Sequence, residues 1–325
     1  MAGNTNSAYR RLCRRFGAEW TTTEMVSSRA LHYNDRKSLG YLEKGDDEVP
    51  CSAQVFGAEP EILAAAARRV AERGFHGVDL NVGCPVPKIT GCGGGSALLR
   101  EPGLAFDCVR AMVEAVDLPV TVKIRAGWDE RQRNAPAFAV LMEEAGAVAI
   151  TIHGRTREQR YRGRADLGIV RDTAAAVSIP VLGNGDVVDV ASARRMAATG
   201  VAGIAVGRGA LGRPWFFAQL RAAFAGEPIP PDPPPAERAA LLLELGRGVA
   251  ALYGERRGLR IMRRLAADFF KGMPGAPRLR AACNALETLD DLRRLSDRMR
   301  LEAASASLPR PCAAGSRPTP DPAPR

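Results

Sequence analysis

A cysteine lies in the segment whose residue types are best suited to catalysis. Residues 79–85 read Asp-Leu-Asn-Val-Gly-Cys-Pro and continue an apolar, β-branched run. Pro85 restricts Cys84 to an extended backbone, so the thiol is expected to project into the loops beyond the strand. A free thiol has a pKa of about 8.5 and is mostly protonated at neutral pH, which suits a general acid. The alternative is a small buried hydrophobic side chain, the usual fate of a free cysteine.

Basic side chains end the next two apolar runs. Lys123 interrupts the run VTVKIR, where an ammonium group is costly unless it meets an anion. His153 opens the string His-Gly-Arg-Thr-Arg, in which Arg155 adds further donors. Each of these residues could be a paired core residue. Their occurrence at successive strand ends favours a shared functional site.

Two glycine-containing turns follow the last apolar runs. Residues 183–186 read Gly-Asn-Gly-Asp, and residues 207–209 read Gly-Arg-Gly. Glycines let backbone N–H groups approach a phosphate, and Arg208 can add a charge-assisted hydrogen bond. Barrel folds often bind phosphate at their last two strands. The pattern predicts a phosphate site, with simple tight turns as the alternative.

Short β-branched runs alternate with longer amphipathic stretches, which favours a parallel sheet. Unusual residues such as Gln54 lie at the ends of many of these runs, as in a barrel, whereas a Rossmann fold concentrates them in one early turn. The predicted fold class is therefore an α/β TIM (β/α)8 barrel, with the first strand apparently missing, followed by a small all-α helical domain. Seven strands are expected, at Trp20–Val26, Ser52–Phe56, Val78–Val82, Val120–Ile124, Ala147–Ile152, Ile179–Leu182 and Gly203–Val206.

Composition divides the chain into four parts. Residues 1–225 form the predicted barrel, and the proline-rich segment 226–235 is expected to be a semi-rigid linker. Residues 236–303 have helical patterns, and the Ala/Ser/Pro/Arg-rich residues 304–325 are expected to be a disordered tail. Within the helical part, residues 256–280 carry eight basic side chains and one acid, Asp268. Such a stretch indicates either nucleic-acid contact or a solvated helix face.

Global composition limits the possible classes. The chain has 325 residues, a formal charge of +10, 46% hydrophobic and 25% charged residues, which is typical of a globular protein. It lacks both a long uncharged apolar run and an N-terminal signal, so we expect a cytoplasmic protein without a membrane span. Seven scattered cysteines without a CxxC pair, and only three histidines, disfavour a metal site and indicate reduced thiols.

Several strings together resemble the bacterial tRNA-dihydrouridine synthases. The resemblance runs from Met1 to about Arg298, with the motifs in the family's order. They are DLNVGCPVPK at residues 79–88, VTVKIRAGW at 120–128, TIHGRTREQ at 151–159, GNGD at 183–186 and GRGALGRPW at 207–215.

The resemblance implies an FMN-binding TIM barrel followed by a helical tRNA-recognition domain. By matching motif positions, Cys84 is implied to be the catalytic acid, and Asn81 is implied to position the uracil. Arg155 is expected to contact the substrate at the same mouth. The residues implied to contact FMN are Gln54, Lys123 and His153 near the ring, Asn184, Gly185, Asp186, Gly207 and Arg208 at the phosphate end, and Met1 and Ala2 in the first motif.

The implied reaction is reduction of the C5–C6 double bond of uridine in tRNA, with NADPH as the electron source. Hydride would pass from flavin N5 to C6, and Cys84 would supply the proton to C5. A stacked uracil is out of reach, so it must turn out into the site. The folded tRNA would be read by basic side chains of the helical part, namely Arg260, Arg263, Arg264 and Lys271.

The N-terminus departs from the family pattern. Members begin with a strand that runs into Pro-Met-Ala-Gly, and Met1-Ala2-Gly3 matches that motif without its proline or the strand. We expect the true start to lie upstream, or this copy to be truncated. Two alternative functions remain open. One is an FMN barrel acting on a free pyrimidine or small enone, and the other is a non-catalytic tRNA-binding protein. We expect the protein to be a monomer.

Overall fold

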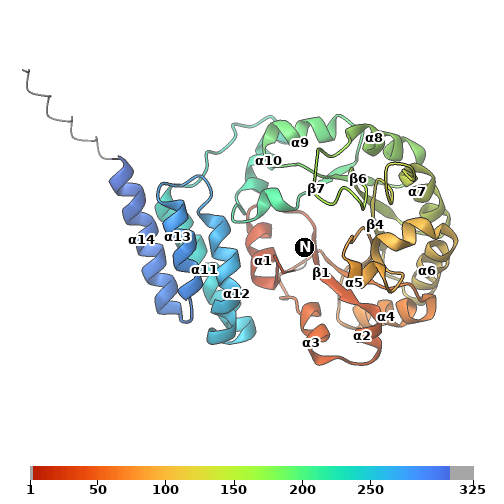
Figure 1. The fold of residues 1–325 in the computed structure, drawn as a ribbon, viewed down its shortest axis with the longest axis horizontal. Helices are drawn as coiled ribbons and strands as arrows, with labels where there is room; N and C mark the ends of the chain where they lie inside the picture. The colour runs from red at the N-terminus through yellow and green to blue at the C-terminus, as the bar shows by residue number, and fades with distance from the viewer. Residues whose placement is uncertain (1–2, 308–325) are drawn as a thin grey trace, which may run out of the picture.

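Seven parallel strands form the framework of this computed structural model, which describes residues 3–307. They pair in chain order, β1 to β7, and helices cover the outer face of the curled sheet (Figure 1). The strands expected from the sequence are confirmed, with each end within two residues, and the α/β TIM-barrel class is confirmed with them. The strands are β1 Thr21–Ser27, β2 Cys51–Phe56, β3 Gly77–Val82, β4 Val120–Arg125, β5 Ala149–His153, β6 Val181–Asn184 and β7 Gly203–Ala205.

The outer helices begin at residues suited to helix starts. Pro60, Pro102 and Pro136 lie in the first turns of three helices, where the missing N–H costs nothing. Asp166 and Asp189 accept hydrogen bonds from the first free N–H groups of two others. The larger barrel helices are α4 Pro60–Glu72, α6 Pro102–Ala115, α7 Ala135–Glu144, α8 Leu167–Ala176, α9 Val190–Ala197 and α10 Phe216–Ala225, and the shorter ones are α2 Ser28–His32, α3 Arg36–Leu39 and α5 Pro87–Thr90.

The two faces of the sheet differ in character because side chains alternate along a strand. In β3 the apolar Val78, Leu80 and Val82 belong to the large hydrophobic cluster shared with the surrounding helices. Between them lie Asp79 and Asn81, which hydrogen-bond to polar side chains of other strands. The inner face of the sheet is therefore polar, unlike a packed apolar barrel core.

The sheet ends at β1 on one side and at β7 on the other. In the part of the chain that the structure describes, no strand pairs with the outer edge of either one. The amide of Gly3 donates to the Glu24 carboxylate of β1, which places the start of the described chain at this edge. Burial raises the pKa of Glu24, although the Gly3 amide opposes the shift.

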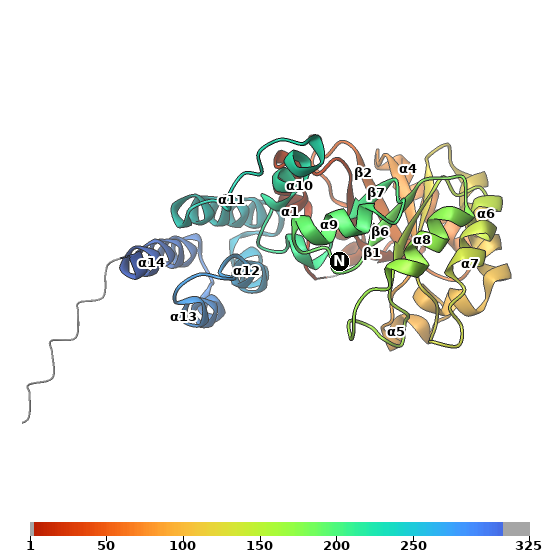
Figure 2. The ribbon, with the colours of Figure 1, turned by 90° about the horizontal axis from the view of Figure 1, so that it is seen from above.

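Four helices after β7 form a second unit with its own hydrophobic core. They are α11 Pro235–Tyr253, α12 Glu255–Phe269, α13 Ala276–Ala282 and α14 Leu289–Ser307. The N-terminal helix α1 Ser7–Arg15 belongs to this second core, because Tyr9 and Leu12 cluster with its side chains. Figures 1 and 2 show α1 between the sheet and the helical unit. None of the described helices is long and apolar enough to cross a bilayer.

Close backbone contacts join the two units. Gly212, in the loop after β7, has a φ of +69°, and a Cβ there would lie 2.2 Å from the carbonyl carbon of Asp268 in α12. A Cβ on Gly248 of α11 would lie 2.9 Å from the Cβ of Ala8 in α1. Glycine at these two positions therefore allows the loop after β7 to approach α12, and α11 to approach α1, more closely than a side chain would permit.

The proline-rich segment between α10 and α11 is held by one carboxylate. Asp232 accepts hydrogen bonds from Trp215 Nε1 at 3.0 Å, Gln219 Nε2 at 2.9 Å and Arg238 at 3.0 Å. At the other end of the helical unit, α14 extends to Ser307, so the first four residues of the expected tail are helical. Residues 308–325 lie outside the described residues.

Candidate active site

The strand register brings the predicted site residues to one end of the sheet. Asn81 is level with Lys123, and His153 is level with Asn184 on the neighbouring strand. Because all strands are parallel, the loops that follow them emerge at this same end. The structure thus brings together Gln54, Asn81, Cys84, Lys123, His153, Asn184, Gly185, Asp186 and Arg208 on β2 to β7 and the loops after them.

The cysteine loop is fixed by hydrogen bonds at both of its ends. The side-chain oxygen of Asn81 accepts from the amides of Gly83, at 3.1 Å, and Cys84, at 2.9 Å. The carbonyl of Cys84 accepts from the Ser96 hydroxyl at 2.9 Å. Gly95 has a φ of +59°, and a Cβ there would lie 2.9 Å from the same carbonyl. The glycine-rich segment therefore packs directly against the cysteine backbone.

Cys84 is buried, with 8% of its surface exposed. Burial raises the pKa of its thiol, while a hydrogen bond from the Val86 amide and the charge of Arg125 oppose the shift. The thiol is consequently protonated at neutral pH. This arrangement can donate a proton and is poorly suited to a nucleophilic thiolate.

Arg125 links the cysteine loop to the loop after β5. Its Nε donates to the carbonyl of Gly83 at 2.7 Å, and its Nη1 donates to the carbonyls of Thr156 and Arg160 at 2.9 and 3.0 Å. Burial lowers the pKa of Arg125 to about 10. The sequence analysis did not select this residue, although its position directly after the VTVKI run was a usable signal.

Lys123 lies near two polar side chains, Asn184 and Asp79, on the inner face of the sheet. Its Nζ donates to Asn184 Oδ1 at 3.3 Å, and Asn184 Nδ2 donates to the carbonyl of Ala205 at 2.6 Å. Burial and the charge of Arg125 together lower the pKa of Lys123 to about 8, although the Asp79 carboxylate opposes the shift. An anion bound beside Lys123 would stabilise its protonated form.

Arg155 forms a bidentate ion pair with Asp186. The two Nη–Oδ distances are 2.8 and 2.7 Å, and Arg155 also donates to the carbonyls of Arg162 and Gly163. Arg155 is only 2% exposed, and its guanidinium is engaged by these partners within the protein. Arg208 approaches the same carboxylate at 3.4 Å and remains 47% exposed.

The site has more positive than negative charge. Lys123, Arg125, Arg155 and Arg208 surround His153, and burial together with these four cations lowers the pKa of His153 to about 2. His153 is therefore a neutral imidazole at physiological pH. The excess of positive charge fits an anionic ligand, such as one that carries a phosphate group.

A second feature missed from the sequence is the exposed part of the loop after β5. Residues 155–164 contain five arginines and one acid. Tyr161 is 55% exposed, and the guanidinium of Arg208 lies 4.5 Å from the centre of its ring. Arg160 and Arg164 are exposed, and neither forms an ion pair with another described residue. The density of arginines in one loop was the signal that could have identified this surface.

The basic residues expected on the helical unit are not equivalent. Arg263 donates to the carbonyl of Leu286 at 3.0 Å and approaches Glu287, and Lys271 is paired with Asp268 at 2.7 Å. Arg260 and Arg264 are exposed and unpaired within the described residues. Arg264 Nη1 would lie 3.2 Å from a Cβ on Gly3, so this side chain borders the barrel. The expected contacts of Met1 and Ala2 lie outside the described residues.

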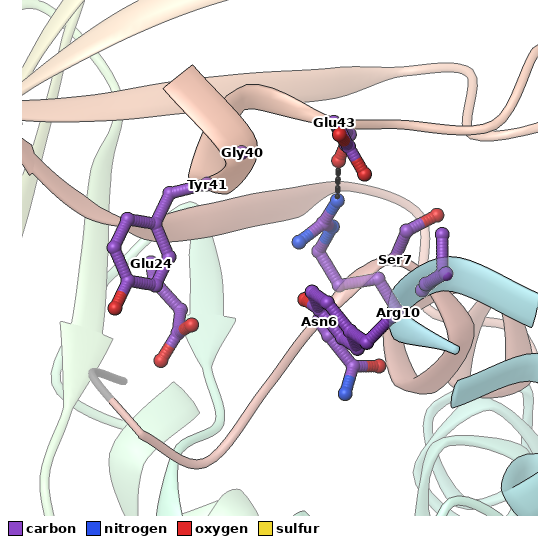
Figure 3. A pocket seen from close by; sticks show the side chains of 9 residues that line it. Asn6, Ser7, Arg10, Glu24, Gly40, Tyr41 and Glu43 are labelled. Carbon is purple, nitrogen blue, oxygen red and sulfur yellow. Dashed lines mark hydrogen bonds between the residues drawn. The ribbon is translucent and has the colours of Figure 1, made fainter. Parts of the chain in front are cut away.

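A small cavity between the two units is not the candidate site. It is lined by Arg10, Glu24 and Tyr253, among others, and its volume of about 10 Å³ is that of one water molecule (Figure 3). Arg10 is held there by a buried ion pair with Glu48 at 2.6 Å and by the carbonyl of Glu43. Among residues 3–307, no cluster of three or more His, Cys, Asp or Glu could hold a metal ion.

Comparisons with known proteins give consistent matches. A family model described as "Dihydrouridine synthase (Dus)" matches residues 1–306. The chain is 42% identical over 293 residues to tRNA-dihydrouridine synthase B of Pseudomonas aeruginosa, which covers 89% of this chain and 88% of that protein. It is 38% identical over 288 residues to a probable tRNA-dihydrouridine synthase of Rickettsia bellii, with 88% of each chain covered. A probable tRNA-dihydrouridine synthase of Rhodobacter capsulatus is 44% identical over 269 residues, with 81% and 82% covered.

Proposed function

Because the chain belongs to the dihydrouridine synthase family, it is an oxidoreductase that reduces uridine in tRNA, and we propose that it uses bound FMN and takes electrons from NADPH. The observation that carries this proposal is the excess of cations at the strand ends. Lys123, Arg125, Arg155 and Arg208 surround the neutral imidazole of His153, and two of these cations, Arg155 and Arg208, share the Asp186 carboxylate. A phosphorylated flavin would supply the missing negative charge.

The proposed division of the site follows from the position of each group. Arg208 and the backbone around Asn184, Gly185 and Gly207 would hold the phosphate end of FMN. Asp186 pairs with Arg155 and orients Arg208. Because these two cations offset its charge, the Asp186 carboxylate would position Arg208 for the phosphate without strongly repelling it. Gln54 and Lys123 would contact the ring, where the ammonium group stabilises negative charge that develops during reduction.

FMN, when bound, supplies the hydride that adds to C6 of the uracil ring. The chain supplies the second hydrogen, because the protonated Cys84 thiol donates its proton to C5 and becomes a thiolate that solvent reprotonates. The uridine must leave its stack to reach a thiol that is only 8% exposed. The Asn81 oxygen is already committed to the amides of Gly83 and Cys84, so a contact with uracil falls to its amide nitrogen.

The test uses the purified full chain. We expect the visible absorption of oxidised flavin, its loss on anaerobic addition of NADPH, and its recovery on addition of tRNA that lacks dihydrouridine. Mass spectrometry of the digested tRNA should then detect dihydrouridine. If a free pyrimidine reoxidised the reduced flavin and tRNA did not, the result would instead support an FMN barrel that acts on a free pyrimidine or small enone. A colourless protein that binds tRNA and takes up no FMN would support the non-catalytic alternative.

We propose that the exposed arginines after β5 contact tRNA phosphates. Replacing both Arg160 and Arg164 by alanine should weaken tRNA binding. It should leave flavin binding unchanged, since neither side chain is among the four cations that surround His153. The slope of log K against log salt should fall by roughly 1.4 to 1.8, because each phosphate contact contributes about 0.7 to 0.9. The measurement is tRNA affinity as a function of salt concentration.

The matched control removes two arginines from the outer helices. Arg110 of α6 and Arg171 of α8 are both exposed and paired with neighbouring carboxylates. Their double replacement by alanine changes the net charge equally and should leave the slope unchanged. Equal slopes for the loop variant and the wild type would contradict the assigned contact.

A further inference from the structure

A chain of hydrogen bonds runs from a buried carboxylate to the cysteine backbone. Gln54 Nε2 donates to Asp79 Oδ2 at 2.7 Å, and Asn81 Nδ2 donates to Gln54 Oε1 at 2.7 Å. The side-chain oxygen of Asn81 then accepts from the amide of Cys84 at 2.9 Å. Asp79, Gln54 and Asn81 are each no more than 9% exposed, so water does not compete freely for these groups.

The chemistry of the two ends fixes the direction of this chain. The Asp79 carboxylate is acceptor-only when ionised, and the Cys84 amide is donor-only. Each side-chain amide between them has one donor end and one acceptor end. Only one orientation of Gln54 and Asn81 therefore satisfies every group. Removing the acceptor at position 79 would leave the Gln54 N–H unpaired in a buried site, and both amides would lose their fixed orientation.

We propose that Asp79 is a positioning residue for Cys84, acting through Gln54 and Asn81 to hold the Gly83–Cys84 backbone, and with it the thiol, in place. Asp79 is buried and precedes Asn81 by two residues on β3, and its other hydrogen bond comes from Thr121 at 2.6 Å. The same chain contains Gln54 and Asn81, which the proposed function places against flavin and uracil. Asp79 would thus fix the orientation of the Gln54 and Asn81 side chains together with the position of the Cys84 thiol.

The groups that face Asp79 come from two strands. Gln54 approaches from β2, and Thr121 and Lys123 approach from β4. Burial raises the pKa of Asp79 to about 6, although the hydrogen bonds from Thr121 and Gln54 and the charge of Lys123 lower it. Asp79 is consequently ionised at neutral pH, and it acts there as the acceptor that the chain requires.

The test separates the acceptor at position 79 from its charge. In Asp79→Asn the side-chain oxygen can still accept from Gln54, whereas in Asp79→Leu a side chain of similar size cannot. Hydrogen–deuterium exchange of the Gly83 and Cys84 amides is the first measurement, and it depends on neither FMN nor activity. We expect exchange to remain slow in Asp79→Asn and to accelerate at least tenfold in Asp79→Leu, as for a lost protecting hydrogen bond. Asp79→Ala serves as the second variant if Asp79→Leu is not recovered folded.

The second measurement is turnover on tRNA. Asp79→Leu should lower kcat about 10²-fold, the loss expected for a misplaced reacting group, and Asp79→Asn should retain most of the wild-type kcat. Thr121→Val is the matched control, because it removes a hydrogen bond to Asp79 that is not part of the chain to Cys84. It should leave the exchange of the two amides unchanged.

Two results would overturn the proposal. One is unchanged exchange of the Gly83 and Cys84 amides in a folded Asp79→Leu or Asp79→Ala protein. The other is equal loss of kcat in Asp79→Asn and Asp79→Leu, which would assign the role of Asp79 to its charge beside Lys123. The proposal rests on the assignment of Cys84 as proton donor. The exchange measurement tests the positioning step even if that assignment fails.

Discussion

Replacing Cys84 by alanine should lower the rate of dihydrouridine formation by about 10² to 10⁴-fold, the range for loss of a positioned general acid. The thiol is buried and its pKa is raised, so we expect it to be protonated and to deliver the proton. Reduction of the flavin by NADPH should continue at the wild-type rate, because that half of the reaction does not use the thiol. The measurement is the rate of each half-reaction by stopped-flow absorption.

Cys108 provides the control for this experiment. Cys108 is fully buried, and it lies in α6 within the hydrophobic core. Cys108→Ala should leave both half-reactions unchanged. Burial raises the pKa of Cys84, so its alkylation by iodoacetamide should be slow at neutral pH and should accelerate only in alkali. Full activity of Cys84→Ala, or rapid alkylation of Cys84 at neutral pH, would show that the acid has been misassigned.

Replacing Arg155 by methionine should both destabilise the barrel and prevent retention of FMN. Its guanidinium pairs with Asp186 and holds two carbonyls of the loop after β5. Removing one partner of a buried ion pair costs about 3 to 5 kcal/mol, and the lower end applies because Asp186 is 37% exposed. The free Asp186 carboxylate would then face the site proposed for the flavin phosphate. Urea denaturation and the flavin content of the purified protein measure the two effects.

Arg171→Met is the matched control for this variant. Arg171 pairs with Asp172 at 3.0 Å, but both side chains are more than half exposed. An exposed ion pair contributes little to stability, so the denaturation midpoint should hardly change. If Arg155→Met and Arg171→Met had the same midpoint and the same flavin content, the buried pair would have no organising role.

Local patterns were enough to predict the strands and the end of the sheet that carries the site. The runs at residues 78–82 and 120–124 alternate apolar with polar side chains, which is the pattern of a strand that buries one apolar face. Chain order then follows, since successive strands joined by helices become parallel neighbours. Lys123 and His153 stood out because charged or polar groups are costly in such runs.

Partners far apart in the chain could not be predicted in the same way. Arg155 was selected as a substrate contact, and the sequence did not show that its guanidinium pairs with Asp186, 31 residues away. Arg263 was expected to read tRNA, yet it binds the carbonyl of Leu286, 23 residues away. The helix α1 was assigned to the barrel part of the chain, yet its apolar face completes the core of the helical unit.

The sequence by itself determined the strand order, the position of the thiol beyond β3 and the excess of basic residues at the strand ends, because these depend on residue type and local periodicity. Only the tertiary structure decided which cations remain free and which side chain holds the backbone of Gly83 and Cys84. That outcome depends on pairings between strands and loops. A buried donor or acceptor takes whichever partner the fold brings within about 3 Å, and the sequence does not state that distance.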